Sequence, residues 1–198
     1  MQNTQRLRCF IQDFTRLVDQ VDNDEGHIFD QGKQLLVDLV SHDDWLDTQF
    51  AQPHPDRYQQ YLLHCDPLER FSVASFIWGP GHTTPIHNHT VWGMVGIMRG
   101  GETCEEFSLD PVSGQLRNEG QHHLAVGEVD LVSPSVGDIH RVSNALDDQV
   151  SVSIHIYGCN IGAVSRHTYD EATGEPNTFI SGYSNSVVPN LWDRSLEA

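Results

Sequence analysis

Two histidines separated by a single residue are the first feature of this sequence that could do chemistry. His87 and His89 lie in a segment bounded by Gly81 and Gly100. On a β-strand alternate side chains point to the same face, so the two imidazoles would project together. Two imidazoles on one face make half of a site for zinc, iron, copper or nickel. Taken alone, the pattern is also compatible with two exposed histidines or with two histidines satisfied within a core.

A third histidine lies in a later stretch that is punctuated by proline and glycine. His140 follows a Pro-x-x-Gly-Asp turn beginning at Pro134, and this turn can aim the imidazole inward. The spacings Gly-x5-His-x-His-x3-(Glu)-x6-Gly and Gly…Pro…Gly-x2-His-x3-Asn resemble the two signature motifs of the cupin superfamily. The matching residues are Gly81, His87, His89 and Gly100, then Gly127, Gly137, His140 and Asn144, with one extra residue before Gly137. The resemblance implies a metal held by the three histidines.

One position departs from the general cupin pattern. The usual glutamate ligand falls on Gly93, which leaves three histidines and no carboxylate. This set resembles the thiol dioxygenases, the family of cysteine dioxygenase and 3-mercaptopropionate dioxygenase. Animal cysteine dioxygenases have a cysteine there that is crosslinked to an active-site tyrosine, whereas bacterial relatives have glycine. The ligand type leaves the metal open, and the resemblance implies Fe(2+). A structural zinc site would need a closed fourth ligand, and none is evident at Gly93.

Polar side chains alternate with branched ones in residues 150–157. Ser153, His155 and Tyr157 share one face of the expected strand, which in a barrel would be the interior. They resemble the Ser-His-Tyr relay of the thiol dioxygenases. A hydroxyl on one imidazole nitrogen and a phenol on the other would fix the tautomer and aim the Tyr157 hydroxyl at the metal. The alternative is a polar strand face that is open to water.

Two residues are candidates for holding a substrate carboxylate. In animal cysteine dioxygenases an arginine stands two residues after a tyrosine on the strand before the first motif, and here that position is Gln60, after Tyr58. Bacterial enzymes of the 3-mercaptopropionate type have an arginine nine residues after the relay tyrosine, and here that residue is Arg166. A guanidinium offers a planar fork of donors that matches a carboxylate. The alternatives are a surface ion pair for Arg166 and an ordinary edge-strand residue for Gln60.

The composition limits the classes of partner. The chain has 198 residues and a formal net charge of -17, which fits one domain and disfavours nucleic acid or an anionic membrane as partners. We expect a single domain spanning 1–198, and the resemblance to the thiol dioxygenases implies that it binds a small thiol and O₂. Four scattered cysteines, no apolar leader and no run of about 20 apolar residues predict reduced thiols and a cytoplasmic protein. The oligomeric state is left open.

The elements that must position these residues fall into three parts. Residues 1–52 carry apolar residues at three- and four-residue steps, which predicts helices, the second around 31–40 and a shorter third one around Trp45–Phe50. Residues 58–170 predict a β-barrel, with strands at 58–64, 71–78, 84–89, 93–99, 103–110, 115–123, 129–134, 139–144 and 150–157. We expect residues 171–198 to form a tail, loop-like at 171–176 and 181–189, that Phe179, Ile180, Tyr183 and Trp192 dock on the barrel. The predicted fold is mainly β: a cupin double-stranded β-helix barrel with N-terminal α-helices packed outside.

The function that the resemblance implies is the addition of both atoms of O₂ to the sulfur of a small carboxylate-bearing thiol. We expect 3-mercaptopropionate as the substrate and 3-sulfinopropionate as the product. The near alternative is cysteine dioxygenase, which would convert L-cysteine to cysteine sulfinate. The distant alternative is a non-catalytic cupin that senses a ligand or a metal.

Overall fold

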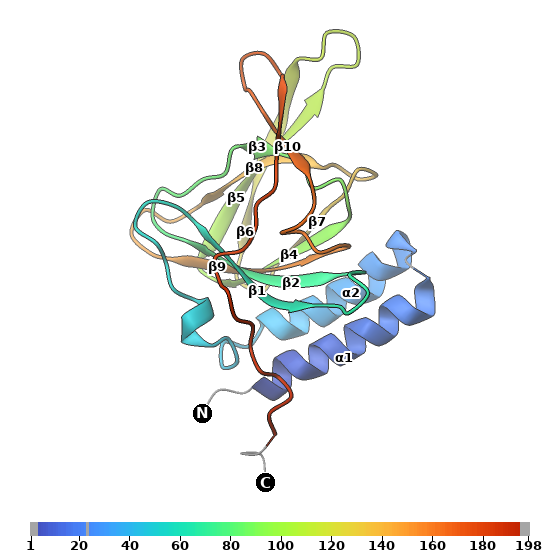
Figure 1. Cartoon of the computed structure of the whole chain (residues 1–198). Coiled ribbons are helices and arrows are strands. Elements are labelled where there is room, and N and C mark those ends of the chain that lie inside the picture. Colours follow the sequence, from blue (N-terminus) through green and yellow to red (C-terminus); the bar gives the residue numbers. More distant parts are fainter. Residues whose placement is uncertain (1–3, 23, 195–198) are drawn as a thin grey trace.

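Two antiparallel sheets face each other in the computed structural model, which describes residues 4–22 and 24–194 (Figure 1). One sheet has the strand order β1-β2-β9-β4-β7 and the other β11-β10-β3-β8-β5-β6. The strands are β1 Gln59–Cys65, β2 Ser72–Trp78, β3 Ile86–His87, β4 Gly93–Arg99, β5 Gly101–Leu109, β6 Leu116–Ala125, β7 Val129–Val132, β8 Ile139–Asn144, β9 Ser151–Tyr157, β10 Arg166–Tyr169 and β11 Pro176–Phe179. The mainly β cupin fold with two N-terminal helices, predicted from the sequence, is confirmed.

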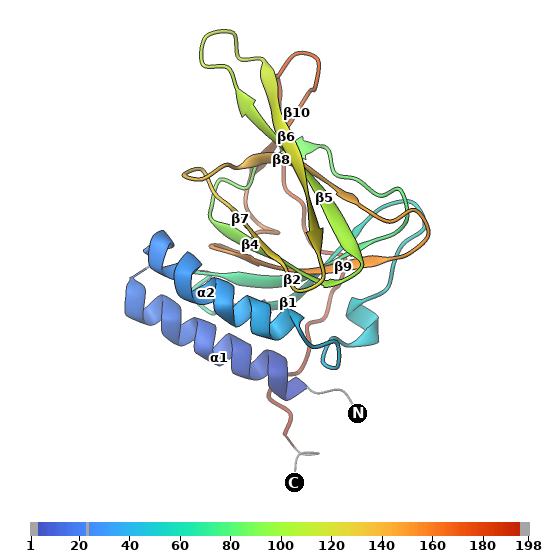
Figure 2. The same ribbon diagram turned by 180° about the vertical axis from the view of Figure 1, so that it is seen from behind.

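Two helices cover the outer face of the five-stranded sheet (Figures 1 and 2). They are α1, Thr4–Val21, and α2, Glu25–Val40. The second begins earlier than the sequence pattern predicts because Asp24 caps it, its carboxylate accepting the His27 backbone N–H at 2.9 Å. The expected third helix is a single 3₁₀ turn, Thr48–Phe50. No helix in the described ranges combines the length and apolar character needed to cross a bilayer.

The central strand β9 separates the two interiors of the molecule. It pairs with β2 on one side and β4 on the other, and all seven of its residues are buried. Val152, Ile154 and Ile156 belong to the hydrophobic core beneath the helices. Tyr157 belongs to a second apolar cluster on the other face of the sheet, between the two sheets. The alternation predicted from the sequence therefore places one face of this strand in the scaffold and the other in the barrel.

The first histidine strand is shorter than expected. Only Ile86 and His87 pair in β3, whereas residues 84–89 were expected to be extended throughout. The chain leaves the sheet after His87 because Thr90 has a positive φ of 63° and the backbone N–H groups of His89 and Thr90 both donate to the Asp138 carboxylate. His89 is consequently held by a side chain from a distant turn and not by a strand ladder.

The tail contains a strand, residues 176–179, that the sequence did not predict. These residues form β11, which pairs with β10, and the two are joined by a turn in which the Gly174 N–H donates to the Asp170 carbonyl at 2.8 Å. The expected anchors also differ, because Ile180 and Trp192 are exposed while Leu191 is buried. Leu191 accepts a hydrogen bond from the Arg8 guanidinium on its carbonyl at 2.9 Å.

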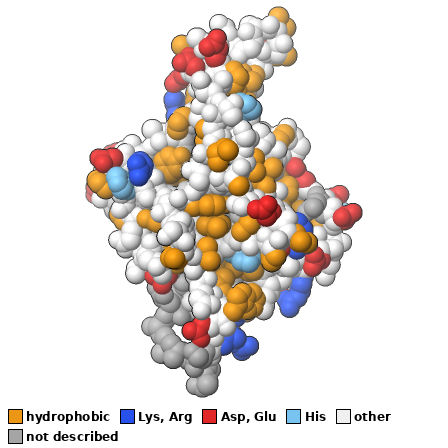
Figure 3. Space-filling model, in the orientation of Figure 1, with side chains coloured by type: hydrophobic (Ala, Val, Ile, Leu, Met, Phe, Trp, Pro, Cys, Tyr) orange, Lys and Arg blue, Asp and Glu red, His pale blue; other side chains and the backbone are white. Residues whose placement is uncertain are grey.

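The segment that follows β11 runs along the edge strand β1. Ser184 N–H donates to the Gln60 carbonyl at 2.8 Å, and the Asn185 side chain bonds both the N–H and the carbonyl of Leu62. On the face seen in Figure 3, which this segment crosses in Figure 1, hydrophobic side chains gather in the middle and acidic side chains lie mostly towards the edges. This segment therefore closes one side of the barrel.

Candidate functional site

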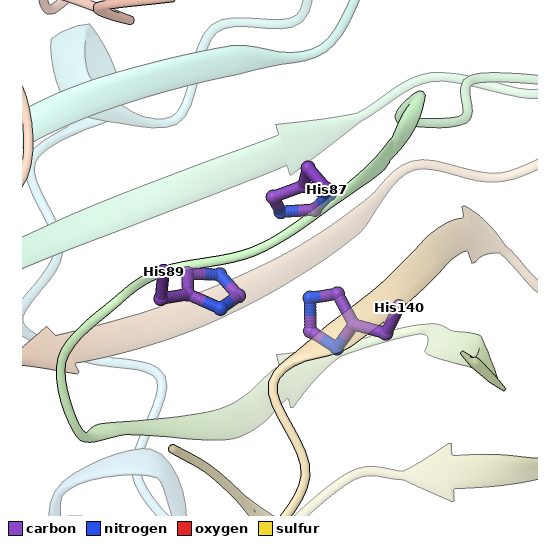
Figure 4. Close-up of side chains that lie close together, drawn as sticks. All are labelled: His87, His89 and His140. Atoms are coloured by element: carbon purple, nitrogen blue, oxygen red, sulfur yellow. The ribbon is translucent and has the colours of Figure 1, made fainter. Parts of the chain in front are cut away.

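Three imidazoles point toward one another inside the barrel (Figure 4). His87 on β3 and His140 on β8 are directly paired across the two strands, and His89 follows two residues after His87. The ring centroids lie 4.8–4.9 Å apart, and one ligand atom of each residue lies within 4.8 Å of the others. The structure thus brings together the three histidines that the sequence motifs predict as metal ligands.

The same nitrogen of each imidazole is engaged away from the centre. The Nδ1 atom of His87 lies 3.0 Å from the Pro85 carbonyl, and that of His89 lies 3.1 Å from the Asp138 carboxylate. The Nδ1 atom of His140 lies 3.5 Å from the Cys104 thiol. Outer partners of this kind orient the ring of a ligating histidine and leave Nε2 for the metal. All three Nε2 atoms are therefore available to one ion.

Burial keeps these imidazoles neutral. Desolvation lowers the pKa of His87 to about 4 and holds the pKa of His89 and His140 well below the usual range. A metal needs the neutral imidazole, so the donor set fits an ion that prefers nitrogen ligands. Gly93 supplies no fourth ligand, and its missing side chain leaves room for an aromatic ring: a Cβ there would lie 2.8 Å from Tyr157 Cδ1.

A continuous hydrogen-bonded chain runs along the inner face of β9. Ser153 Oγ lies 2.8 Å from His155 Nε2, and His155 Nδ1 lies 2.8 Å from the Tyr157 hydroxyl. Phe76 stacks on the His155 ring with centroids 3.9 Å apart, which fixes the plane of the imidazole. Burial lowers the pKa of His155 to about 3 and raises the pKa of Tyr157 well above its usual range, so both side chains are neutral. The Tyr157 ring stacks on His89, with centroids 5.2 Å apart.

Arg166 and Gln60 line the same cavity as the histidine triad. Arg166 is only 4% exposed, and its guanidinium donates through Nη2 to Ser181 Oγ at 2.7 Å and lies over the Phe179 ring. The Nε atom of Arg166 and the Nε2 atom of Gln60 are buried and have no hydrogen-bond partner. Among the described residues, no carboxylate forms an ion pair with Arg166. The cavity therefore presents unsatisfied donors, one of them on a cation.

The cavity measures about 200 Å³. Its walls combine aromatic and aliphatic side chains with four histidines, two threonines, one serine and the two donors Gln60 and Arg166. The lining residues are Tyr58, Gln60, Phe76, Trp78, Thr84, Pro85, His87, His89, His140, Val142, His155, Tyr157, Arg166, Thr168, Phe179 and Ser181. No aspartate or glutamate occurs among these lining residues, so the cavity suits a small anion with an apolar stem.

Several supporting residues were not predicted from the sequence. Asp138 holds His89 by side chain and backbone, and its place in the Pro-x-x-Gly-Asp turn next to a motif glycine was an available signal. Tyr58 stacks on Trp78 with centroids 4.8 Å apart and lines the cavity. Ser181, which holds Arg166, lies in a segment whose sequence carries no sign of that contact.

A second group of metal-ligand types lies behind His140. Cys104, His122 and Asp130 also place ligand atoms within 4.8 Å of one another. His122 is already paired, its Nε2 with Asp130 at 3.0 Å and its Nδ1 with Glu106 at 3.3 Å. Burial raises the pKa of the Cys104 thiol, so this thiol stays protonated. This group is therefore an imidazole held between two carboxylates, beside a thiol that contacts His140.

These features define a cupin with a three-histidine site, and the comparisons with known proteins extend that class. The sequence matches the family described as "Cysteine dioxygenase type I" over residues 8–172, and the chain belongs to this family. It is 25% identical to "Cysteine dioxygenase type 1" of Danio rerio over 172 residues, 85% of this chain and 83% of the relative. It is 28% identical to the Homo sapiens protein of the same name over 133 residues, 65% of each chain.

A solved structure also resembles the barrel. It is an uncharacterized conserved protein with a double-stranded β-helix domain from Klebsiella pneumoniae, with a TM-score of 0.46 and 12% identity. The match covers 60% of this chain and 91% of that chain.

Proposed function

We propose that this protein is an Fe(2+)-dependent thiol dioxygenase whose preferred substrate is 3-mercaptopropionate. Membership of the cysteine dioxygenase type I family and the triad His87, His89 and His140 support the reaction class. The reaction is RSH + O₂ → RSO₂H, in which both oxygen atoms join the sulfur and the thiol supplies all four electrons. Iron held by the triad would supply the activation of O₂ and the acidification of the thiol.

The substrate carboxylate would bind at Arg166 and Gln60. The unpartnered Nε of Arg166 and Nε2 of Gln60 are the observation that carries this proposal, because a buried donor without an acceptor costs free energy that a ligand can recover. An arginine with no acidic partner is poised for an anionic ligand. The small cavity would hold the two-carbon stem against the aromatic wall and exclude water.

The Tyr157 hydroxyl would hold or deliver a proton beside the reacting sulfur. This hydroxyl is neutral, and its hydrogen bond with His155 positions it. The stacking of the Tyr157 ring on His89 fixes its distance from the triad. A positioned donor of this type is worth about 10²-fold in rate in other enzymes.

The absence of a lining carboxylate distinguishes the two candidate substrates. L-cysteine and 3-mercaptopropionate share the thiol, the carboxylate and the carbons between them, and they differ in the α-ammonium. No lining residue among those described offers a negative charge to that ammonium. Cysteine would therefore lose hydration of its ammonium without an ion pair in return. The name of the relatives, cysteine dioxygenase type 1, supports the alternative substrate L-cysteine.

Oxygen consumption with a panel of thiols tests the proposal. The iron-loaded protein is assayed with 3-mercaptopropionate, L-cysteine and cysteamine, and the sulfinate is identified by mass spectrometry. We expect kcat/KM for 3-mercaptopropionate to exceed that for L-cysteine by at least about tenfold, the equivalent of one charged partner. A preference for L-cysteine would establish the cysteine dioxygenase alternative. No oxygen uptake with any thiol would favour a non-catalytic cupin.

A further inference from the structure

One fully buried carboxyl group has no part in the site described so far. Glu102 lies on β5 with no exposed surface, and no cation pairs with it among the described residues. Its Oε1 accepts a long hydrogen bond from Ser151 Oγ at 3.4 Å, and its Oε2 makes no regular hydrogen bond. A buried carboxyl group in an apolar barrel is costly unless it acts, so its neighbours are informative.

The carboxyl group lies at the inner end of the Ser153–His155–Tyr157 chain. The Ser153 hydroxyl and the Trp78 indole lie close enough to it to lower its pKa as hydrogen-bond donors, although burial outweighs them and raises the pKa from 4.5 to about 7. Trp78 Nε1 also donates to Ser153 Oγ at 3.2 Å. Both protonation states of Glu102 are therefore accessible near neutral pH.

Counting the protons of Ser153 gives two complete arrangements. Its oxygen accepts from Trp78 and lies 2.8 Å from His155 Nε2, and a bond to the unpartnered Oε2 of Glu102 would leave it one lone pair and one hydrogen to share between Glu102 and His155. When Glu102 is ionised, Ser153 donates to it and accepts from His155 Nε2–H, and His155 Nδ1 then accepts the Tyr157 O–H. When Glu102 is protonated, every bond reverses: Glu102 donates to Ser153, Ser153 to His155 Nε2, and His155 Nδ1–H to the Tyr157 oxygen.

We propose that Glu102 is a positioning residue whose proton sets the direction of the Ser153–His155–Tyr157 chain. With Glu102 protonated, the Tyr157 hydroxyl is free to donate into the metal cavity. With Glu102 ionised, the hydroxyl donates backward to His155 and presents only its oxygen to the cavity. For its catalytic consequence this inference rests on the proposed dioxygenase function, whereas the coupling between Glu102 and His155 does not.

No other charged group competes for control of the Glu102 proton. The titratable side chains that face it are Cys104 on its own strand and His155 and Tyr157 on β9. Its strand partners, Leu124 of β6 and Asn144 of β8, are uncharged. Arg99 of β4 keeps its guanidinium in an ion pair with Asp43, 2.8 Å away at the surface. Burial holds Cys104, His155 and Tyr157 neutral, so Glu102 is the group that changes charge.

The tautomer of His155 gives a test that does not require activity. The full chain, labelled with ¹⁵N-histidine and loaded with diamagnetic Zn²⁺, is followed by NMR between pH 6 and 9, and a His155→Gln variant assigns the signal. We expect the His155 proton to move from Nδ1 to Nε2 as the pH rises through about 7. In Glu102→Gln the side chain cannot ionise, so one tautomer should persist at every pH. Glu106→Gln, on the exposed part of the same strand, should behave like the wild type.

Two results would overturn the proposal: a single His155 tautomer across this pH range in the wild type, or the same pH-dependent change in Glu102→Gln. The spectra remain interpretable even if no thiol proves to be a substrate and can be repeated without metal, so failure of the proposed function is distinguishable.

Steady-state kinetics supply the catalytic readout. In Glu102→Gln the pH profile of kcat should lose its ionisation near neutrality, while KM for 3-mercaptopropionate changes less than about twofold, because Glu102 does not line the cavity. In a Tyr157→Phe background the Glu102→Gln change should have no further effect on kcat. An unaltered profile, or equal effects of Glu102→Gln with and without the tyrosine hydroxyl, would refute a role through Tyr157.

Discussion

Removing the guanidinium of Arg166 should separate binding from stability. Its side chain is 4% exposed, its Nε has no partner, and no described carboxylate is paired with it. A hydrogen bond to a charged group contributes about 1.5–3 kcal/mol, so Arg166→Gln should lower kcat/KM for 3-mercaptopropionate by about 10- to 150-fold. Arg166→Lys should recover only part of this loss, because an ammonium keeps the charge and loses the planar fork.

The same substitution should leave the protein as stable as the wild type or more stable. A buried cation without an acidic partner carries a desolvation cost of several kcal/mol, and glutamine removes that cost in exchange for the single hydrogen bond to Ser181. Thermal unfolding of the metal-free chain would therefore show an equal or higher Tm for Arg166→Gln. This outcome is opposite to that expected for an arginine that holds the fold together.

The assay pairs two thiols that differ only where Arg166 acts. Propane-1-thiol has a methyl group where 3-mercaptopropionate has the carboxylate, so its kcat/KM should barely respond to Arg166→Gln. Arg99→Gln, which breaks a surface pair with Asp43, is the matched arginine control and should alter neither thiol. Equal losses with both thiols, or a marked fall in Tm, would refute the assignment of Arg166 to the carboxylate.

Four further changes test the rest of the site. His89→Ala should remove most bound iron, and metal analysis showing full iron content would contradict its assignment as a ligand. Tyr157→Phe should keep the iron and slow kcat by about 10²-fold, whereas an unchanged rate would assign the hydroxyl to packing. Gly93→Ala should lower the free energy of unfolding by about 1–3 kcal/mol and slow turnover, because the new Cβ would lie 2.8 Å from the Tyr157 ring. A Tm equal to that of the wild type would show that the ring moves freely. Glu102→Gln should raise the Tm at pH 8 but not at pH 5. The pKa of Glu102 is about 7 in the folded protein, against an ordinary value of 4.5. The wild-type carboxyl group therefore stabilises the fold at acid pH, and this contribution is lost as the pH rises. A Tm difference that is independent of pH would contradict this reasoning.

The parts of the site that follow from local pattern could be predicted from the sequence. The alternation in β9 puts Ser153, His155 and Tyr157 on one face whatever the partner strands are. The spacing of His87 and His89 and the turn before His140 gave the triad, although His89 lies beyond the end of β3. For β9 the period of the backbone decides where the side chains point, whereas His89 was predicted from the motif and is positioned by Asp138 outside the strand.

The parts that depend on distant segments were missed. The strand β10 exists because Thr168 and Tyr169 pair with His87 and Ile86, and nothing within residues 166–169 signals that pairing. Glu102 reads as an ordinary charged residue in a strand, and only the packing of β5 against β9 buries it. Ser181 meets Arg166 because β10 and β11 form a hairpin, an arrangement that the short, polar strand β11 does not predict.

The segment that follows β11 has an evolutionary consequence. It supplies Ser181 to the guanidinium and is fastened to the edge of β1 by Ser184 and Asn185, while its apolar anchors are Leu191 and Tyr183. Substitutions at Ser181 can retune which anion the cavity accepts without disturbing these anchors or the histidines. Members of this family can therefore come to accept different substrates while the barrel and its histidines stay the same. The positions that vary with the substrate should concentrate in the segment that follows β11.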